Sequence, residues 1–165
     1  MPPSPKPIKL TPRQMIAQWV GADHKFQVNV HNFEVSAGKA AVETFQKSFE
    51  LKRFNGASGK RWPSWQGRYA GAGSLLDETG TLKNSIKVKS IKNHTITVFT
   101  DPTDFLHGPK RHRGFCYAAV HNNLDSLSIK PSRGPKRERQ FMGHSTVLKQ
   151  KLEKLSVHLF DGLPL

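Results

Sequence analysis

The sequence predicts an α+β fold in which a long helix packs on a small antiparallel sheet, with an amphipathic helix at the C-terminal end. Three patterns indicate this class. Apolar residues recur at helical spacing over roughly 33–54, two short alternating runs lie at 85–91 and 95–100, and four leucines share one face of 144–160. The chain has 165 residues, so we expect one domain, spanning 11–165.

The N-terminal residues divide into an arm and a short helix. Residues 1–10 contain four prolines and two lysines, a composition that favours an extended arm. Thr11 is the predicted N-cap of the helix, and Pro12 is its first residue. We expect this helix to end near Gly21.

A strand and the long helix are expected next. Residues 26–31 alternate apolar and polar side chains, which predicts a short strand. Val35, Val42 and Phe45 then follow a helical period, which predicts the helix over 33–54. Asn55 and Gly56 are expected to stop it.

The middle of the chain combines a loop, a helical turn and a hairpin. Residues 55–74 contain five glycines and a proline, so we expect a loop whose tryptophans cover a core edge or fill a neighbour's pocket. Thr79 is expected to cap one helical turn over 81–84. The runs 85–91 and 95–100 are predicted to form a hairpin, with turn residues at 92–94.

The last third of the chain is basic. Residues 106–114 form a predicted basic loop, and 115–121 is apolar and suits either a strand or a turn of helix. Residues 122–139 form a long polar connection with a second basic cluster. Leu148, Leu152, Leu155 and Leu159 share one face of the predicted terminal helix.

The formal net charge is +14, and such an excess repels itself unless anions offset it. Nucleic acid is the commonest anionic partner. The basic clusters suit three alternatives: contact with a phosphate backbone, docking on acidic protein surfaces, or plain solvation. The candidate residues for DNA or subunit contacts are Lys110, Arg111, Arg113, Lys130, Arg133, Lys136, Arg137 and Arg139.

We find no pattern of catalytic or metal-binding residues, so we expect no enzyme, no cofactor and no metal. Asp77 and Glu78 lie in a turn context, and no spacing of the eight histidines matches a zinc site. Cys116 and His121 are close in sequence, but a small buried cysteine explains the first better than a nucleophile does. A metal-dependent nuclease would need clustered carboxylates, which the sequence does not offer.

The number of cysteines, the N-terminal residues and the length of the apolar runs bear on the compartment in which the protein works. The single cysteine excludes an internal disulfide, and the N-terminal residues do not resemble a secretory signal. No apolar run approaches the roughly 18 residues of a membrane span, so we expect no membrane partner.

Several segments, taken in order, resemble one family. Trp62-Pro63 precedes the run LLDETGTLKNSI at 75–86, YAAVH follows at 117–121, and RQFMG follows at 139–143. Their order and spacing resemble the phage virion morphogenesis family, the tail-completion proteins of contractile-tailed phages and prophages. The matching positions are Trp62, Pro63, Leu76, Thr79, Gly80, Leu82, Ser85, Ile86, Tyr117, His121, Phe141 and Gly143.

The chain also departs from that pattern. Gln140 and Met142 stand where the family usually has proline and leucine, and Asn122-Asn123 replaces a glutamine-phenylalanine-glycine after the histidine.

The resemblance implies a structural virion protein that completes the tail or neck and helps to join tail to head. It implies a ring homo-oligomer, expected to be a hexamer, around the DNA passage. The partners would be other copies of the chain, other tail and neck proteins, and double-stranded DNA bound without sequence preference. The protein would be assembled in the host bacterial cytoplasm and end in the virion. The alternative is a free basic nucleic-acid-binding protein, such as an RNA- or DNA-associated factor.

Overall fold

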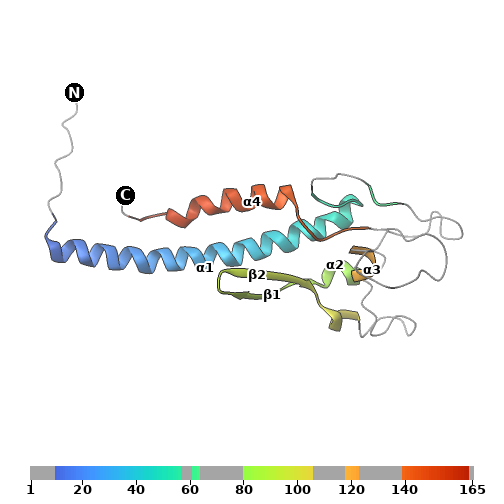
Figure 1. Ribbon diagram of the computed structural model, residues 1–165, viewed down its shortest axis with the longest axis horizontal. Helices are drawn as coiled ribbons and strands as arrows, with labels where there is room; N and C mark the ends of the chain where they lie inside the picture. Colours follow the sequence, from blue (N-terminus) through green and yellow to red (C-terminus); the bar gives the residue numbers. More distant parts are fainter. Residues whose placement is uncertain (1–9, 57–60, 64–79, 106–117, 123–138, 164–165) are drawn as a thin grey trace, which may run out of the picture.

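The molecule is elongated, and one long helix runs through most of its length (Figure 1). The computed structural model describes residues 10–56, 61–63, 80–105, 118–122 and 139–163. The predicted α+β class is confirmed: the long helix packs against a two-stranded antiparallel sheet and a C-terminal helix. The elements in chain order are α1 (Pro12–Leu51), α2 (Thr81–Asn84), β1 (Ile86–Lys92), β2 (Thr95–Thr100), η2 (Pro102–Phe105), α3 (Ala118–Asn122), α4 (Thr146–Ser156) and η4 (Val157–Phe160).

The main correction concerns the first fifty residues. We predicted a short helix, a strand at 26–31 and a second helix, but α1 is one continuous helix of 40 residues. Phe26 and Asn29 lie three residues apart on the same face of α1, so the spacing that matters is helical. The Phe26 ring lies 6.0 Å from the ring of Phe160, and Asn29 Nδ2 donates to the carbonyl of Leu159 at 3.1 Å. The strand prediction was wrong because Asn29, one of the two residues that contact η4, is polar. The spacing of apolar residues alone therefore does not reveal this helical face.

The ends of α1 follow local sequence rules. Thr11 is the N-cap as predicted, and its side chain forms a capping box with Gln14. The helix ends at Leu51, three residues earlier than predicted, because Lys52 adopts a left-handed conformation with φ of 51°. Asn55 therefore does not stop the helix directly, and its Nδ2 donates instead to the carbonyl of Thr44 at 3.2 Å.

The predicted hairpin is confirmed. β1 and β2 pair antiparallel, with Lys92 opposite Thr95. The two connecting residues, Asn93 and His94, have φ of 48° and 58°, as a two-residue type I′ turn requires. The register shifts between Val88 and Ser90, which marks a β-bulge.

The hairpin lies very close to α1 at Gly38. A Cβ added there would lie 3.0 Å from Cγ2 of Val88, so glycine permits the close approach. At the tip of the hairpin, His94 Nδ1 lies 2.7 Å from Oε1 of Glu34.

The predicted terminal helix is confirmed as α4 followed by the 3-10 helix η4. Ser145 caps α4, since its hydroxyl accepts from the N–H of Leu148 at 3.2 Å. The same hydroxyl donates to the carbonyl of Asn55 at 2.5 Å and so ties the start of α4 to the region just after α1. Figure 1 shows α4 running antiparallel to α1, with the hairpin beside α1 on the other side.

The core lies where α1 ends. It is built from buried aromatic and aliphatic side chains of α1, α2, β1, η2, α3 and three irregular segments: Ala41, Phe45, Phe49, Phe54, Trp62, Leu82, Ile86, Phe105, Ala118 and Phe141. The N-terminal half of α1 does not contribute to it. This asymmetry places every described motif residue at one end of the molecule.

Candidate functional site

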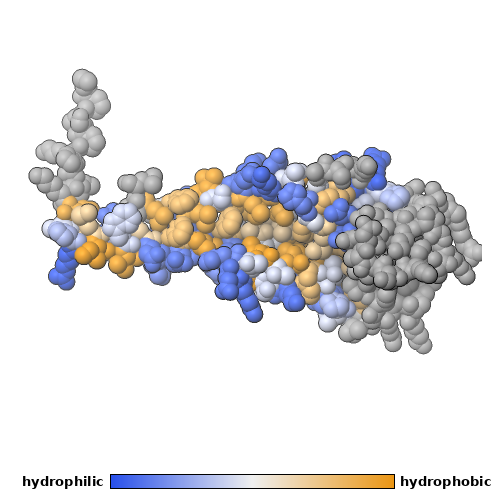
Figure 2. Space-filling view, in the orientation of Figure 1, coloured by the Kyte–Doolittle hydropathy of each residue, from blue (hydrophilic) through white to orange (hydrophobic). Residues whose placement is uncertain are grey.

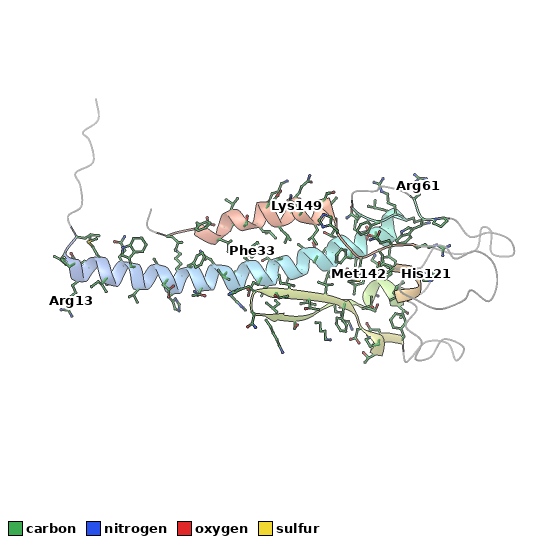
Figure 3. The ribbon with its side chains drawn as sticks, in the orientation of Figure 1. Arg13, Phe33, Arg61, His121, Met142 and Lys149 are labelled. Atoms are coloured by element: carbon green, nitrogen blue, oxygen red, sulfur yellow. The ribbon has the colours of Figure 1, made fainter. Side chains whose placement is uncertain are left out.

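Segments that are distant in sequence meet around the ring of Phe49, and we call this region the motif junction (residues 61–63, 118–122 and 139–143, with Phe49). The Phe49 ring lies 5.4 Å from Trp62 in a T-shaped arrangement and 5.2 Å from Phe141. Figure 3 labels His121 and Met142 at this end of the molecule. The resemblance to a family therefore rests on residues that share one core.

Trp62-Pro63 contacts the 139–143 segment through directed hydrogen bonds. Trp62 Nε1 donates to the carbonyl of Gln140 at 2.8 Å. The guanidinium of Arg139 donates to the carbonyl of Pro63, from Nε at 3.3 Å and from Nη2 at 3.1 Å. The tryptophan-proline pair thus fixes the position of the 139–143 segment. Of the two alternatives predicted for the loop tryptophans, packing on the core is correct for Trp62, and Trp65 lies outside the described residues.

Arg139 was a predicted DNA or subunit contact, but the structure buries it. Its exposed fraction is 4%, and its guanidinium lies against Pro63. A buried guanidinium needs hydrogen-bond acceptors to offset its lost hydration, and a backbone carbonyl supplies one here. The role of Arg139 is therefore internal, and the prediction of an external contact for it was wrong.

The α3 helix holds the 139–143 segment from the other side. The carbonyl of His121 accepts from the N–H of Arg139 at 2.9 Å. Oδ1 of Asn122 accepts from the N–H groups of Phe141 at 3.0 Å and Met142 at 2.8 Å. Of the two structures predicted for 115–121, the helical turn is correct for the described part, α3.

Sequence reasoning missed the role of Asn122, because it is a position at which the chain departs from the family pattern. One amide oxygen satisfies two backbone donors that no regular element pairs. An asparagine beside a helix end was the only available signal, and it does not identify a partner about twenty residues away.

His121 is the one titratable group in the junction with a strong shift. Burial, together with the charge of Arg139 nearby, lowers the pKa of His121 to about 4. The imidazole is therefore neutral at physiological pH. A neutral ring with a pKa this low is a weak base, so the shift favours a packing role over proton transfer.

The second half of the first motif forms the base of the hairpin. Gly80, with a left-handed φ of 68°, is the N-cap of α2, so the prediction that Thr79 caps this turn was wrong; no side chain of the described residues caps the turn. Leu82, Ser85 and Ile86 are fully buried or nearly so. The hydroxyl of Ser85 donates to the carbonyl of Leu82 at 2.8 Å. The backbone carbonyl of Ser85 accepts from the N–H of Asp101 at 2.7 Å. These residues close the turn and direct β1 into the core.

Gly143 is conformationally required. Its φ of 148° lies in the region that favours glycine, and a Cβ there would lie 2.5 Å from Nε2 of Gln140. Gly143 thus permits the bend that precedes α4.

Other predicted site residues lie outside the described residues. They are Leu76, Thr79, Tyr117, Lys110, Arg111, Arg113, Lys130, Arg133, Lys136 and Arg137, and the interpretations of Asp77, Glu78 and Cys116 fall there too. Within the described ranges, no three His, Cys, Asp or Glu side chains gather to hold a metal ion. In the same ranges, no helix is long and apolar enough to cross a membrane.

Comparisons of the chain with protein-family models, with curated proteins and with solved structures found no match.

Proposed function

We propose that this protein is a structural virion protein that completes the tail or neck of a phage and helps to join tail to head. In this proposal it acts as a ring of identical subunits around the DNA passage, with six as the expected number. Its partners are other copies of itself and other tail and neck proteins. It carries out no reaction and needs no cofactor.

The observation that supports this best is the convergence of the motif segments in one core. Trp62, His121 and Phe141 come from three separate stretches, yet direct contacts link their segments. The groups that meet there are aromatic rings, backbone amides, a buried guanidinium and a neutral imidazole. Such a set stabilises a particular shape and offers no activated nucleophile or acid–base pair.

The particle phenotype tests this proposal. Deletion of the gene from the phage or prophage genome that encodes it should leave filled heads and tails that do not join, visible by electron microscopy. A plasmid copy of the wild-type gene should restore joined particles. Normal yields of infectious, joined particles from the deletion strain would contradict the proposal.

The net charge has a role in the same proposal, because a basic lumen would offset phosphate charge. We expect the purified full chain to bind duplexes of two unrelated sequences equally, with an affinity that falls steeply as salt rises. Neutralising Lys110, Arg111 and Arg113 together should reduce the salt slope by roughly two to three.

A control of equal charge tests the location of this effect. Neutralising Lys89, Lys92 and Lys154, which are exposed on the hairpin and on α4, removes the same charge elsewhere. If both triple variants lose the same affinity for duplex DNA, net charge alone drives binding, and the predicted basic loop at 106–114 has no special role. If duplex binding is absent at low salt, the basic clusters serve protein contacts or solvation.

The alternative function, a free basic nucleic-acid-binding protein, is favoured by the charge of +14 alone. It predicts a protein that stays monomeric, binds nucleic acid tightly and is dispensable for particle assembly. Oligomer size measured with and without DNA therefore separates the two functions.

A further inference from the structure

The first turns of α1 extend beyond α4, η4 and the hairpin, and we call residues 12–24 the α1 projection. On one side of it, Gln18, Gly21 and Ala22 line a pocket with Gly162 and Leu163. Every residue from 10 to 21 is exposed. Met15, Ile16, Trp19 and Val20 are nevertheless apolar, with exposed fractions between 47% and 66%. Figure 2 shows hydrophobic residues along this end of the molecule, continuing toward its middle. A cluster of this kind on a single helix indicates a contact surface.

The apolar residues of the α1 projection continue the faces that α1 uses in the body of the molecule. Met15 and Trp19 lie on the helical face that carries Phe26 and Phe33, which contact the C-terminal segment. Val20 lies on the face of Gly38, where the hairpin packs. The projection thus extends both packing faces past the end of the chain's own α4 and hairpin.

A shallow groove in the body is left open by the residues that the structure describes, and we call it the α4 groove. It lies between α1 and α4, has a volume of about 460 Å³, and is lined by Phe33, Gly143, Ser145, Leu148, Leu152 and Ser156 among others. Figure 3 labels Phe33 and Lys149 on its two sides. Its lining is largely apolar, so it suits an apolar side chain.

The α1 projection cannot fill the α4 groove of its own molecule. Trp19 and Phe33 lie on one continuous helix, and fourteen residues at about 1.5 Å each separate them by about 21 Å along its axis. A helix does not fold back on itself without a break. The α1 projection of the same molecule is therefore excluded as the occupant of the groove.

Charge favours a second copy as the occupant. Arg13 and Asp23 cancel within residues 12–24, so the α1 projection has no net charge in a chain of +14. On the rim of the groove, Lys149 lies 3.8 Å from Glu153, so these charges also cancel. Two strongly basic molecules can approach each other most easily through such neutral surfaces, whereas an acidic partner would be drawn to the basic segments.

We propose that the α1 projection of one subunit packs into the α4 groove of the next copy of this chain, with Trp19 as its anchor. The inference rests on the proposed ring, and it names the subunit contact. The two surfaces differ, so the contact is head to tail and generates a closed ring or a filament. Three helical turns bury less than the roughly 800 Å² per partner of a stable interface, but each ring subunit makes two such contacts.

Cysteine pairing tests the geometry. In a Cys116→Ser background, Gln18→Cys places a thiol beside Trp19, and Ser156→Cys places one in the groove of the full chain. The double variant should give a ladder of disulfide-linked multimers on mild oxidation. A mixture of the two single variants should give dimers only. Dimers from Gln18→Cys alone would indicate symmetric pairing of projections and overturn the proposal, as would an absence of any ladder.

A charge in the α1 projection tests its energetic role. Trp19→Glu should shift the full chain from multimers to monomers in sedimentation velocity, without loss of thermal stability, because Trp19 lies outside the core. The matched control is Val157→Glu, since Val157 is apolar and 67% exposed but lines neither surface. Equal dissociation by both variants would overturn the proposal.

These outcomes separate the inference from the proposed function. If Trp19→Glu leaves the rings intact, the contact is elsewhere, and the ring proposal still stands on the particle phenotype. If the wild-type chain is monomeric at all concentrations, the contact proposed here is excluded, whereas deletion of the gene still tests head–tail joining.

Discussion

Single residues in the motif junction stabilise it in ways that their chemical type alone does not reveal. Asn122 binds two backbone N–H groups, Arg139 binds a backbone carbonyl, and Phe141 fills the space beside Phe49. All three act on the same irregular segment. Because no sheet or helix pairs that segment, side chains must position it.

The Phe141 ring is fully buried, so its removal leaves a cavity. Phe141→Ala should lower the free energy of unfolding by about 3–5 kcal/mol in urea titrations. Phe160→Ala is the matched control, because Phe160 is 61% exposed, and it should cost less than about 1 kcal/mol. Equal losses would mean that Phe141 is not part of a close-packed core.

Asn122→Leu removes the acceptor of two N–H groups and should cost about 2–4 kcal/mol of unfolding free energy. Asn122→Asp retains an oxygen at the same position and should keep most of the stability. Equilibrium unfolding of both variants checks this prediction. A loss in the aspartate variant as large as that in the leucine variant would indicate that the amide N–H₂ group matters instead.

His121 should make stability depend on pH. Its folded pKa of about 4 lies below the ordinary value of 6.5, so the unfolded chain binds more protons between these values. The contribution of His121 to the free energy of unfolding is therefore fully present above about pH 6.5 and is lost as the pH falls toward 4. The loss is on the order of 1–2 kcal/mol at about pH 5.

His121→Gln should flatten this slope in thermal melts between about pH 7 and pH 5. The pKa values of Asp101 and Glu50 are lowered as well, chiefly by hydrogen bonds from Thr103 and from Lys47. Those carboxylates start from ordinary values of 3.8 and 4.5, so their protonation affects stability mainly at more acidic pH. An unchanged slope in the variant would assign the pH dependence to other groups.

At the scale of elements, the length of α1 is the feature that sequence reasoning misjudged. Gly21 was expected to end a helix, but an isolated glycine costs a helix only about 1 kcal/mol. Elongation of an existing helix is cooperative, so the chain continues through Gly21 into the packed part of α1. The alternating residues 26–31 form part of this helix and not a strand, because Phe26 and Asn29 contact η4 from one face of α1.

Gly21→Ala tests this continuity, since a Cβ at that position meets nothing within 4 Å. We expect a gain of up to about 1 kcal/mol in local helix stability, visible as slower amide hydrogen exchange over residues 12–24. The hairpin amides provide an internal control and should be unaffected. Faster exchange in the variant would contradict a continuous helix.

At the scale of the whole molecule, charge and shape are unevenly distributed. The core lies at the end of the molecule where α1 ends, and the α1 projection, which has no net charge, lies at the other end. In the described ion pairs, acidic partners such as Glu50, Asp101 and Asp104 contact lysines, yet the chain keeps +14. The excess charge must be offset by solvent ions or by a partner.

Salt should therefore stabilise the fold. Raising sodium chloride from about 20 to about 300 mM should raise the melting temperature, because screening weakens the repulsion among the excess positive charges. Sodium sulfate at equal ionic strength should raise it further, since it also strengthens apolar burial. A melting temperature that falls with sodium chloride would mean that the described ion pairs outweigh the net repulsion.

Local patterns predict four features that the structure contains: the fold class, the hairpin, the capped start of α1 and the terminal helix. The signals are Thr11 with Pro12, two alternating runs joined by turn residues at 92–94, and leucines on one helical face. The sequence also indicated that Trp62, Leu82 and Phe141 matter, because large apolar residues beside turns must be buried somewhere.

Three features depend on tertiary contacts: the full length of α1, the position of the Arg139 guanidinium, and the hydrogen-bond partners of Asn122. In each case the deciding contact joins residues far apart in the chain: Asn29 with Leu159, Arg139 with Pro63, and Asn122 with Phe141. Local pattern contains no information about such partners, because their proximity exists only after the chain has closed those loops.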